Sequence, residues 1–207
     1  NAHIYNVACH NMRLRDCLNA ARLTLADGMA IVWAARALGQ NLAERCNMTE
    51  AYHAFLETKG MPPSQAILIG CSQAEADAAA AKANHTSAHC RIVAAYSGYL
   101  TEADYREAFF QHREIDFILL GMGTPRTELM ASLAAEACPR AIIWGIGGGT
   151  IRIEAGSMKE APPAWRRLGL QWAYRLREEP RVLWRRYLIG NPLFVFRMMT
   201  AWVRRRE

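Results

Sequence analysis

One carboxylate near the start of the chain stands where an enzyme could use it. Asp27 and Gly28 separate the short apolar segment Leu23–Leu25 from residues 29–38, whose apolar side chains recur at helical spacing. This order predicts a strand, a turn and a helix, and α/β proteins often place their chemistry at such a turn. Asp27 could therefore be a general base. It could equally be the N-cap of the following helix, accepting hydrogen bonds from backbone N–H groups.

Glycines that close three predicted strands form a second candidate site. They are Gly70, then Gly121 and Gly123, then Gly145 and Gly147–Gly149. Glycine lets backbone N–H groups approach a phosphate, and a following helix adds favourable potential, so a nucleotide diphosphate would fit. The alternative is that these glycines only turn the chain. Neither GMGTPR nor GIGGGT matches the full GxGxxG fingerprint, which gives a dinucleotide cofactor little support.

The middle of the chain repeats a strand and a helix. Apolar runs predict strands at 66–70, 91–96, 116–121 and 141–146, separated by predicted helices at 72–84, 101–112 (capped by Thr101) and 124–138. Continuous apolar strands that alternate with helices predict a parallel sheet covered on both faces. We therefore expect a Rossmann-like α/β domain over residues 1–162, followed by a helical appendage over residues 163–207.

The appendage differs from the rest of the chain in charge. Residues 165–207 hold 11 Arg and 3 Glu, a net charge of +8, whereas residues 1–164 hold 14 Lys or Arg and 16 Asp or Glu, a net charge of −2. Four of the six tryptophans also lie in 165–207. Arg and Trp beside apolar residues suit the surface of an anionic membrane. Nucleic acid is the alternative partner, and a lid packed on the core is the structural alternative.

Three helical segments are predicted within the appendage. The second begins at Pro180, a break follows at Asn191–Pro192, and the third ends in Arg204–Arg206. The first carries an apolar stripe at helical spacing, formed by Trp165, Leu168, Trp172 and Leu176.

Several classes of protein are disfavoured by composition. An apolar fraction of 52% argues against disorder. There is neither a signal-peptide pattern near Asn1 nor an uncharged apolar run of transmembrane length. The six cysteines form no CxxC pair and the histidines are scattered, so we expect reduced thiols in a cytosolic protein, without a metal site.

The motifs occur in an order that resembles one family over nearly the whole chain. They are Asp27-Gly28, ERCN at Glu44–Asn47, GMGTPRTE at Gly121–Glu128, GIGGG at Gly145–Gly149, APPAW at Ala161–Trp165, LQWAYRL at Leu170–Leu176, EPR at Glu179–Arg181 and RRY at Arg185–Tyr187. This set resembles the WecG/TagA/CpsF glycosyltransferases. The resemblance implies transfer of a sugar from a UDP-sugar to a polyprenyl-diphosphate-linked sugar at the cytoplasmic face of the bacterial inner membrane. It also implies inversion at the anomeric carbon, with no metal or other cofactor.

The same resemblance implies roles for individual residues. Asp27 becomes the general base that deprotonates the acceptor hydroxyl, and Arg45 and Asn47 line the donor pocket. The two glycine loops hold the UDP diphosphate through Gly121, Gly123, Thr124, Pro125, Glu128, Gly145, Gly147 and Gly148. Positive charge for the diphosphate and the membrane comes from Arg175, Arg181 and Arg185.

Four positions depart from the family pattern. Met48 replaces a usual glycine, Thr127 a usual glutamine, Glu160 a usual arginine and Gln171 a usual glutamate. Thr127 and Met48 bear on which sugar fits, and N-acetylmannosamine, its uronic acid and glucose are the candidates.

Three hypotheses of different classes follow from the sequence. The first is the membrane-associated UDP-sugar transferase, without a nucleic-acid partner and possibly a homo-oligomer. The second is a nucleotide-binding oxidoreductase, which the incomplete glycine fingerprint disfavours. The third is a non-enzymatic membrane or nucleic-acid adaptor, which Asp27 and the two glycine loops disfavour.

Overall fold

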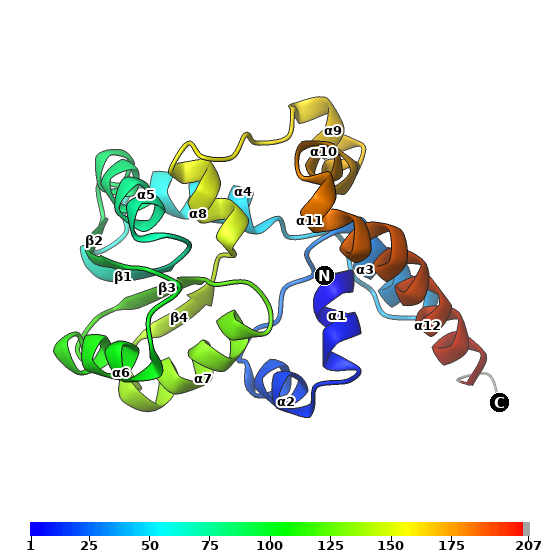
Figure 1. Ribbon diagram of the computed structural model, residues 1–207, viewed down its shortest axis with the longest axis horizontal. Coiled ribbons are helices and arrows are strands. Elements are labelled where there is room, and N and C mark those ends of the chain that lie inside the picture. Colours follow the sequence, from blue (N-terminus) through cyan, green and yellow to red (C-terminus); the bar gives the residue numbers. More distant parts are fainter. Residues whose placement is uncertain (205–207) are drawn as a thin grey trace. The chain divides into compact units, whose positions relative to one another are not determined.

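A parallel β-sheet organises the middle of the chain in the computed structural model, which describes residues 1–204 (Figure 1). Its strands are β1 (Ser64–Gly70), β2 (Cys90–Tyr96), β3 (Phe117–Gly121) and β4 (Ile142–Gly145). Every neighbouring pair is parallel, and the strand order is β2-β1-β3-β4. The expected Rossmann-like α/β fold with a parallel sheet is confirmed.

Helices cover both faces of this sheet (Figure 1). They are α4 (Met48–Glu57), α5 (Gln73–Thr86), α6 (Glu102–Gln111), α7 (Arg126–Ala137) and α8 (Gly148–Glu154). Ala66 and Leu68 pack with α4, α5 and α8, whereas Ile67 and Ile69 pack with α6 and α7. Successive strand residues point to opposite faces, so a strand buried on both faces must be apolar throughout. Capping boxes at Ser72 and Thr101 begin α5 and α6, which confirms the predicted cap at Thr101.

The chain divides into two compact units. The sheet unit comprises Cys17–Ala20 and Met48–Lys159, and the helical unit comprises Asn1–Asp16, Ala21–Asn47 and Glu160–Glu207. The C-terminal helices are therefore grouped with segments from the beginning of the chain. The domain boundaries inferred from the sequence, 1–162 and 163–207, remain a prediction.

The helical unit is built from short helices and one long helical run. The short helices are α1 (Ala2–Ala8), most of α2 (Met12–Ala20), α3 (Met29–Ala37), α9 (Pro163–Arg167) and α10 (Gln171–Glu178). The long run consists of α11 (Pro180–Trp184), the π-helical turn η1 (Arg185–Ile189) and α12 (Gly190–Arg204), and we call it the C-terminal rod. Helix α1 packs on it, with the rings of Tyr5 and Phe194 edge to face at 5.4 Å and Asn6 Nδ2 donating to Gly190 O at 2.7 Å.

Three local predictions are wrong. Leu23–Leu25 forms no strand, because the described sheet begins at Ser64 and offers this segment no partner. The predicted first helix of the appendage is broken at Gly169, whose φ of +71° separates α9 from α10 and divides the expected stripe.

The third wrong prediction is the break at Asn191–Pro192. Helix α12 runs through it to Arg204, and the π-helical turn η1 ends only three residues before Pro192, where the α-helical hydrogen-bond pattern is already interrupted. The end of the third predicted segment, residues 205–207, lies outside the described part of the chain.

Glycines allow three backbone segments to pack closely at the carboxyl edge of the sheet. A Cβ atom built on Gly70 would lie 2.5 Å from the carbonyl oxygen of Gly121. One built on Gly148 would lie 3.0 Å from the same oxygen. The ends of β1 and β3 and the start of α8 can approach each other this closely only without side chains at these positions.

We predict that Gly70→Ala destabilises the protein by about 1–3 kcal/mol, because its Cβ would meet backbone atoms that cannot rotate away. Gly190→Ala is the matched control, since its φ is −66° and its Cβ would meet nothing closer than 3.7 Å. Urea unfolding of both variants measures the difference. Equal stability of Gly70→Ala and wild type would contradict the packing described here.

Candidate active site

The strand order creates a switch point in the sheet unit. The chain leaves β1 for β2 on one side and crosses to β3 on the other, so the loops after β1 and β3 diverge at the carboxyl edge. Ligands of open α/β sheets bind at such a point. The predicted loop Gly121–Pro125 begins there, and the loop Gly145–Gly148 follows the neighbouring strand.

Side chains in the first turn of α7 fix the loop after β3. Thr127 Oγ1 accepts from the N–H of Met122 at 3.0 Å, and its own N–H donates to Gly123 O at 2.9 Å. Thr124 Oγ1 donates to Glu128 Oε1 at 2.9 Å. The other carboxylate oxygen of Glu128 is buried and has no hydrogen-bond partner in the part of the chain described here. A buried carboxylate oxygen of this kind can accept a hydrogen bond from a bound ligand.

The two predicted glycine loops lie next to each other. The N–H groups of Ile146 and Gly147 both donate to Leu120 O, at 2.9 and 3.1 Å, which joins the end of β4 to the end of β3. Gly123 and Gly147 have φ values of +78° and +82°, and a Cβ on either would meet nothing within 4 Å. Open space beside backbone in this conformation is what close approach of a phosphate requires.

Cys71 also holds these loops together, and sequence reasoning missed it. Its φ of +57° is unusual for a residue with a side chain. Its Sγ donates to Gly148 O at 3.4 Å and contacts Gly121 O at 3.8 Å. Burial, with a smaller contribution from Glu75, raises the pKa of this thiol to about 11, so it remains protonated and able to donate.

Asp27 belongs to the helical unit and does not cap a helix. The N-cap of α3 is Gly28, and no side chain caps that helix, so the capping interpretation is wrong. The partly buried carboxylate instead accepts from Asn1 Nδ2 at 3.3 Å. Its role as a base stays a prediction, and its side chain is not occupied with holding a helix end.

Arg186 is a cation of the helical unit that interacts electrostatically with Asp27, and sequence reasoning did not select it. Burial lowers its pKa most, Tyr187 raises it, Arg175 lowers it, and the carboxylate of Asp27 makes the smallest contribution and raises it. Arg remains protonated in proteins, so Asp27 and Arg175 are charged groups of the helical unit that act electrostatically on the guanidinium of Arg186. Burial, with Arg186 contributing, also lowers the pKa of His3 to about 4, so His3 is neutral at pH 7.

Gln171 connects Arg45 and Asn47 to α10 inside the helical unit. Its Oε1 accepts from Asn47 Nδ2 at 2.8 Å and from Arg45 Nη1 at 3.3 Å. Arg45 also donates to Arg166 O at 3.2 Å, and Arg166 forms an ion pair with Glu160 at 2.7 Å. Together with Thr127, three of the four departures from the family pattern therefore have defined contacts in this chain.

A comparison with known protein families decides the class of the chain. The pattern of the Glycosyl transferase WecG/TagA/CpsF family matches residues 1–207. The chain belongs to this family. It is therefore a member of a family of glycosyltransferases, and both the oxidoreductase and the adaptor hypotheses lose their basis.

The residues predicted for this glycosyltransferase fall into separate groups. The glycine loops and Glu128 lie in the sheet unit, whereas Asp27, Arg45, Asn47 and the arginines lie in the helical unit. Within the helical unit, Arg175 acts electrostatically on Arg186, whereas Arg181 and Arg185 are exposed. Arg185 stacks on the ring of Trp184, with 5.2 Å from Cζ to the ring centroid.

The C-terminal rod exposes large apolar side chains to solvent. Val182, Phe196 and Met199 have exposed fractions of 74%, 64% and 64%. Patches of this kind mark surfaces that contact lipid, protein or ligand. None of the helices within residues 1–204 combines the length and apolar character needed to cross a bilayer. Those same residues contain no group of three His, Cys, Asp or Glu side chains arranged to hold a metal ion.

We predict that Gln171→Ala lowers the stability of the transferase by about 1–3 kcal/mol, because Arg45 and Asn47 lose a shared acceptor. Gln171→Glu keeps that acceptor oxygen and should be at least as stable as wild type. Urea unfolding compares them with Gln40→Ala, an exposed position of the same unit. If Gln171→Ala behaved like Gln40→Ala, the Gln171 contacts would have no energetic importance.

Proposed function

We propose that the protein transfers a sugar from a UDP-sugar to a polyprenyl-diphosphate-linked sugar, with inversion at the anomeric carbon and without a metal ion. The observation that carries this proposal is the carboxylate of Asp27, which caps no helix and interacts electrostatically with Arg186, on which Arg175 also acts. A base that interacts with a cation suits a reaction that removes a proton while a diphosphate leaves.

The chemical step follows from these groups. The hydroxyl oxygen of the acceptor bonds to the anomeric carbon while the bond from that carbon to the UDP oxygen breaks. Asp27 takes the hydroxyl proton and later releases it to water. UDP leaves with the electron pair, and attack opposite the leaving group inverts the anomeric centre.

The sheet unit is proposed to bind the donor. Backbone N–H groups around Gly123 and Gly147 would contact the diphosphate, because both positions have open space beside them. The buried, unpartnered oxygen of Glu128 would accept a hydrogen bond from the sugar or the nucleoside. Arg45 and Asn47 remain proposed donor-pocket residues, held by Gln171.

The helical unit is proposed to supply the base and the positive charge. Of the three arginines inferred from the sequence, Arg175 acts on the guanidinium of Arg186, as Asp27 does, and we assign it to the leaving diphosphate. The exposed Arg181 and Arg185 are assigned to anionic lipid at the cytoplasmic face of the bacterial inner membrane. The exposed apolar residues of the C-terminal rod support this peripheral location.

We expect transfer to persist in excess EDTA, because arginines and backbone N–H groups supply the charge that a metal would otherwise supply. Release of UDP in the presence of a polyprenyl-diphosphate-linked sugar measures it, with UDP-N-acetylmannosamine, its uronic acid and UDP-glucose as donors. Loss of UDP release in EDTA, with recovery on adding Mg²⁺ or Mn²⁺, would contradict the metal-free mechanism. Absence of release with every donor would count against the proposed function.

We predict that Asp27→Asn lowers the turnover rate by about 10² to 10⁴ while leaving UDP affinity near that of wild type, because the amide cannot take the proton. Asp16→Asn is the matched control, since Asp16 is an exposed carboxylate of the helical unit. UDP release gives the rate, and calorimetric titration with UDP gives the affinity. A variant with more than half of the wild-type rate would remove Asp27 as the base.

A further inference from the structure

Two polar pairs join helices α4 and α8 within the sheet unit. In the first pair, Thr49 Oγ1 lies 3.0 Å from Thr150 Oγ1. In the second, His53 Nε2 lies 2.7 Å from Glu154 Oε1. In each helix the second residue follows the first by four positions, which is about one helical turn. The two helices are therefore paired in register and run in the same direction.

The hydroxyl groups of the first pair form a directed chain that ends in the loop after β4. Thr150 Oγ1 donates to the carbonyl oxygen of Ile146 at 2.8 Å. A threonine hydroxyl has a single proton, so the proton between the two threonines comes from Thr49. Both side chains lie inside the protein, since Thr49 and Thr150 have exposed fractions of 8% and 2%. The chain therefore fixes one backbone carbonyl of the loop Gly145–Gly148, to which we assign the donor diphosphate.

The second pair contains a buried carboxylate. The side chain of Glu154 is 2% exposed, and its Oε1 also lies 3.4 Å from Lys82 Nζ of α5. Burial raises the pKa of Tyr52 in α4, and the charge of Glu154 raises it further. Glu154 thus connects the last residue of α8 to both α4 and α5.

Polar contacts are a costly way to hold two helices together. Buried hydroxyls and a buried carboxylate lose more hydration than apolar side chains of similar size would lose. In return, directed hydrogen bonds fix the position of α8 along its axis, because sliding would break both pairs at once. Ile151, which follows Thr150, has the same requirement, since its Cδ1 would lie only 2.6 Å from a Cβ atom built on Gly70.

We propose that the two polar pairs hold the loop Gly145–Gly148 in the geometry that binds the donor diphosphate. The positioning residues are Thr49, His53, Thr150 and Glu154, which act through the loop and not on the substrate. The inference rests on the proposed function. A shift of the Ile146 carbonyl would also move the N–H groups of Ile146 and Gly147, which donate to Leu120 O. Loss of the hydroxyl chain should therefore weaken donor binding even where the protein remains folded.

The test replaces Thr150 in the full chain and measures UDP affinity by calorimetric titration. Thr150→Val keeps the shape of the side chain and removes the hydroxyl, whereas Thr150→Ser keeps the hydroxyl. We expect Thr150→Val to bind UDP about tenfold more weakly than wild type, because the Ile146 carbonyl loses its buried donor. Thr150→Ser should bind UDP within about twofold of wild type, since the chain of hydroxyls is retained.

Phe109→Leu is the matched control for a general loss of stability. Phe109 is fully buried in α6, in the core on the other face of the sheet, so its truncation destabilises the sheet unit away from the loop. We expect urea unfolding to show this loss and UDP affinity to stay unchanged.

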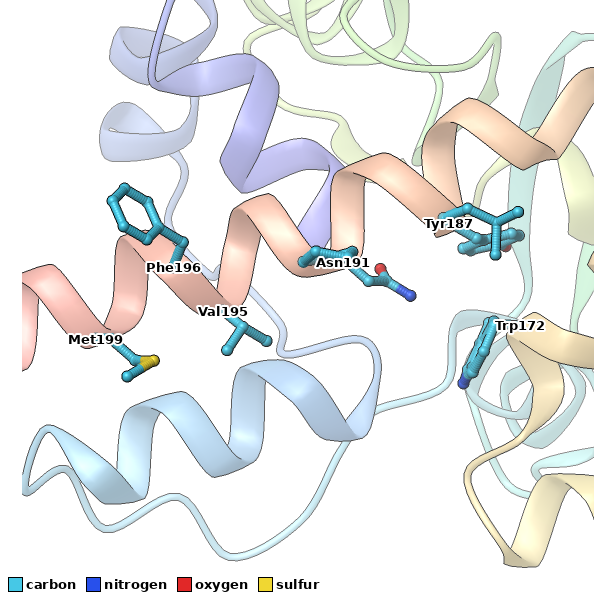
Figure 2. A pocket seen from close by; sticks show the side chains of 8 residues that line it. Trp172, Tyr187, Asn191, Val195, Phe196 and Met199 are labelled. Carbon is cyan, nitrogen blue, oxygen red and sulfur yellow. The ribbon is translucent and has the colours of Figure 1, made fainter.

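Sedimentation with phosphatidylglycerol vesicles is a second control. An open apolar groove follows the C-terminal rod, where Val195 and Met199 point to the same side of α12 (Figure 2). All residues that line it belong to the helical unit, so the Thr150 and Phe109 variants leave them intact and should sediment like wild type.

Two results would overturn the inference. Wild-type UDP affinity in Thr150→Val would show that the polar pairs only stabilise the fold. An equal loss of UDP affinity in Phe109→Leu would assign the effect to stability in general. If Thr150→Val did not fold, Glu154→Gln would replace it, with an expected weakening of about threefold, and unchanged UDP affinity would again refute the inference.

The outcome for wild type separates this inference from the proposed function. Wild-type protein that bound no UDP would refute the proposed function and this inference together. Tight UDP binding that is insensitive to Thr150→Val would refute the positioning role alone and leave the proposed function in place.

Discussion

The structure depends on the close approach of three backbone segments at the carboxyl edge of the parallel sheet. Gly70, Gly121 and Gly148 permit this approach, since a Cβ on the first would lie 2.5 Å from a carbonyl oxygen. The packed strand ends and the fixed loop after β3 expose backbone groups at the carboxyl edge of the sheet. Positive φ at Gly123 and Gly147 leaves space beside that backbone, which gives the sheet unit its proposed affinity for a nucleotide diphosphate.

In the helical unit, the proposed chemistry depends on interactions between charged side chains and not on the backbone. Arg186 stays charged although burial lowers its pKa, and Asp27 offsets part of that cost. His3 is neutral beside it, because burial and Arg186 hold its pKa at about 4. Asp27 thus interacts electrostatically with Arg186 and does not cap a helix. Such a carboxylate can accept a proton while the same charges bind phosphates.

The sheet and its helices could be predicted because their signals are local. Continuous apolar runs identified the four strands, and the helix start at Thr101 agreed with its capping box. Leu23–Leu25 was wrongly assigned because three apolar residues do not reveal whether a sheet edge is available to pair with them. The continuous rod was missed because Asn191–Pro192 resembles a helix break, and the sequence does not show that a π-helical turn precedes it.

The candidate site was predictable by residue type but not by side-chain partner. The sequence selected Arg185 and not Arg186, and only the folded structure shows that Arg186 interacts electrostatically with Asp27 whereas Arg185 stacks on Trp184. In the sequence, Gln171 was only a departure from the family pattern. The structure shows that its side-chain oxygen accepts hydrogen bonds from Arg45 and Asn47. The central claim, that this chain is built to use a UDP-sugar, is tested most directly by thermal unfolding with UDP, UDP-sugars, NAD or short duplex DNA. A ligand at 100 times its Kd stabilises the native state by about 2.7 kcal/mol, which raises Tm by roughly 5–11 °C for a chain of this size. The account predicts that UDP and at least one UDP-sugar raise Tm while NAD and DNA do not, and a rise with NAD or DNA but not with UDP would contradict it.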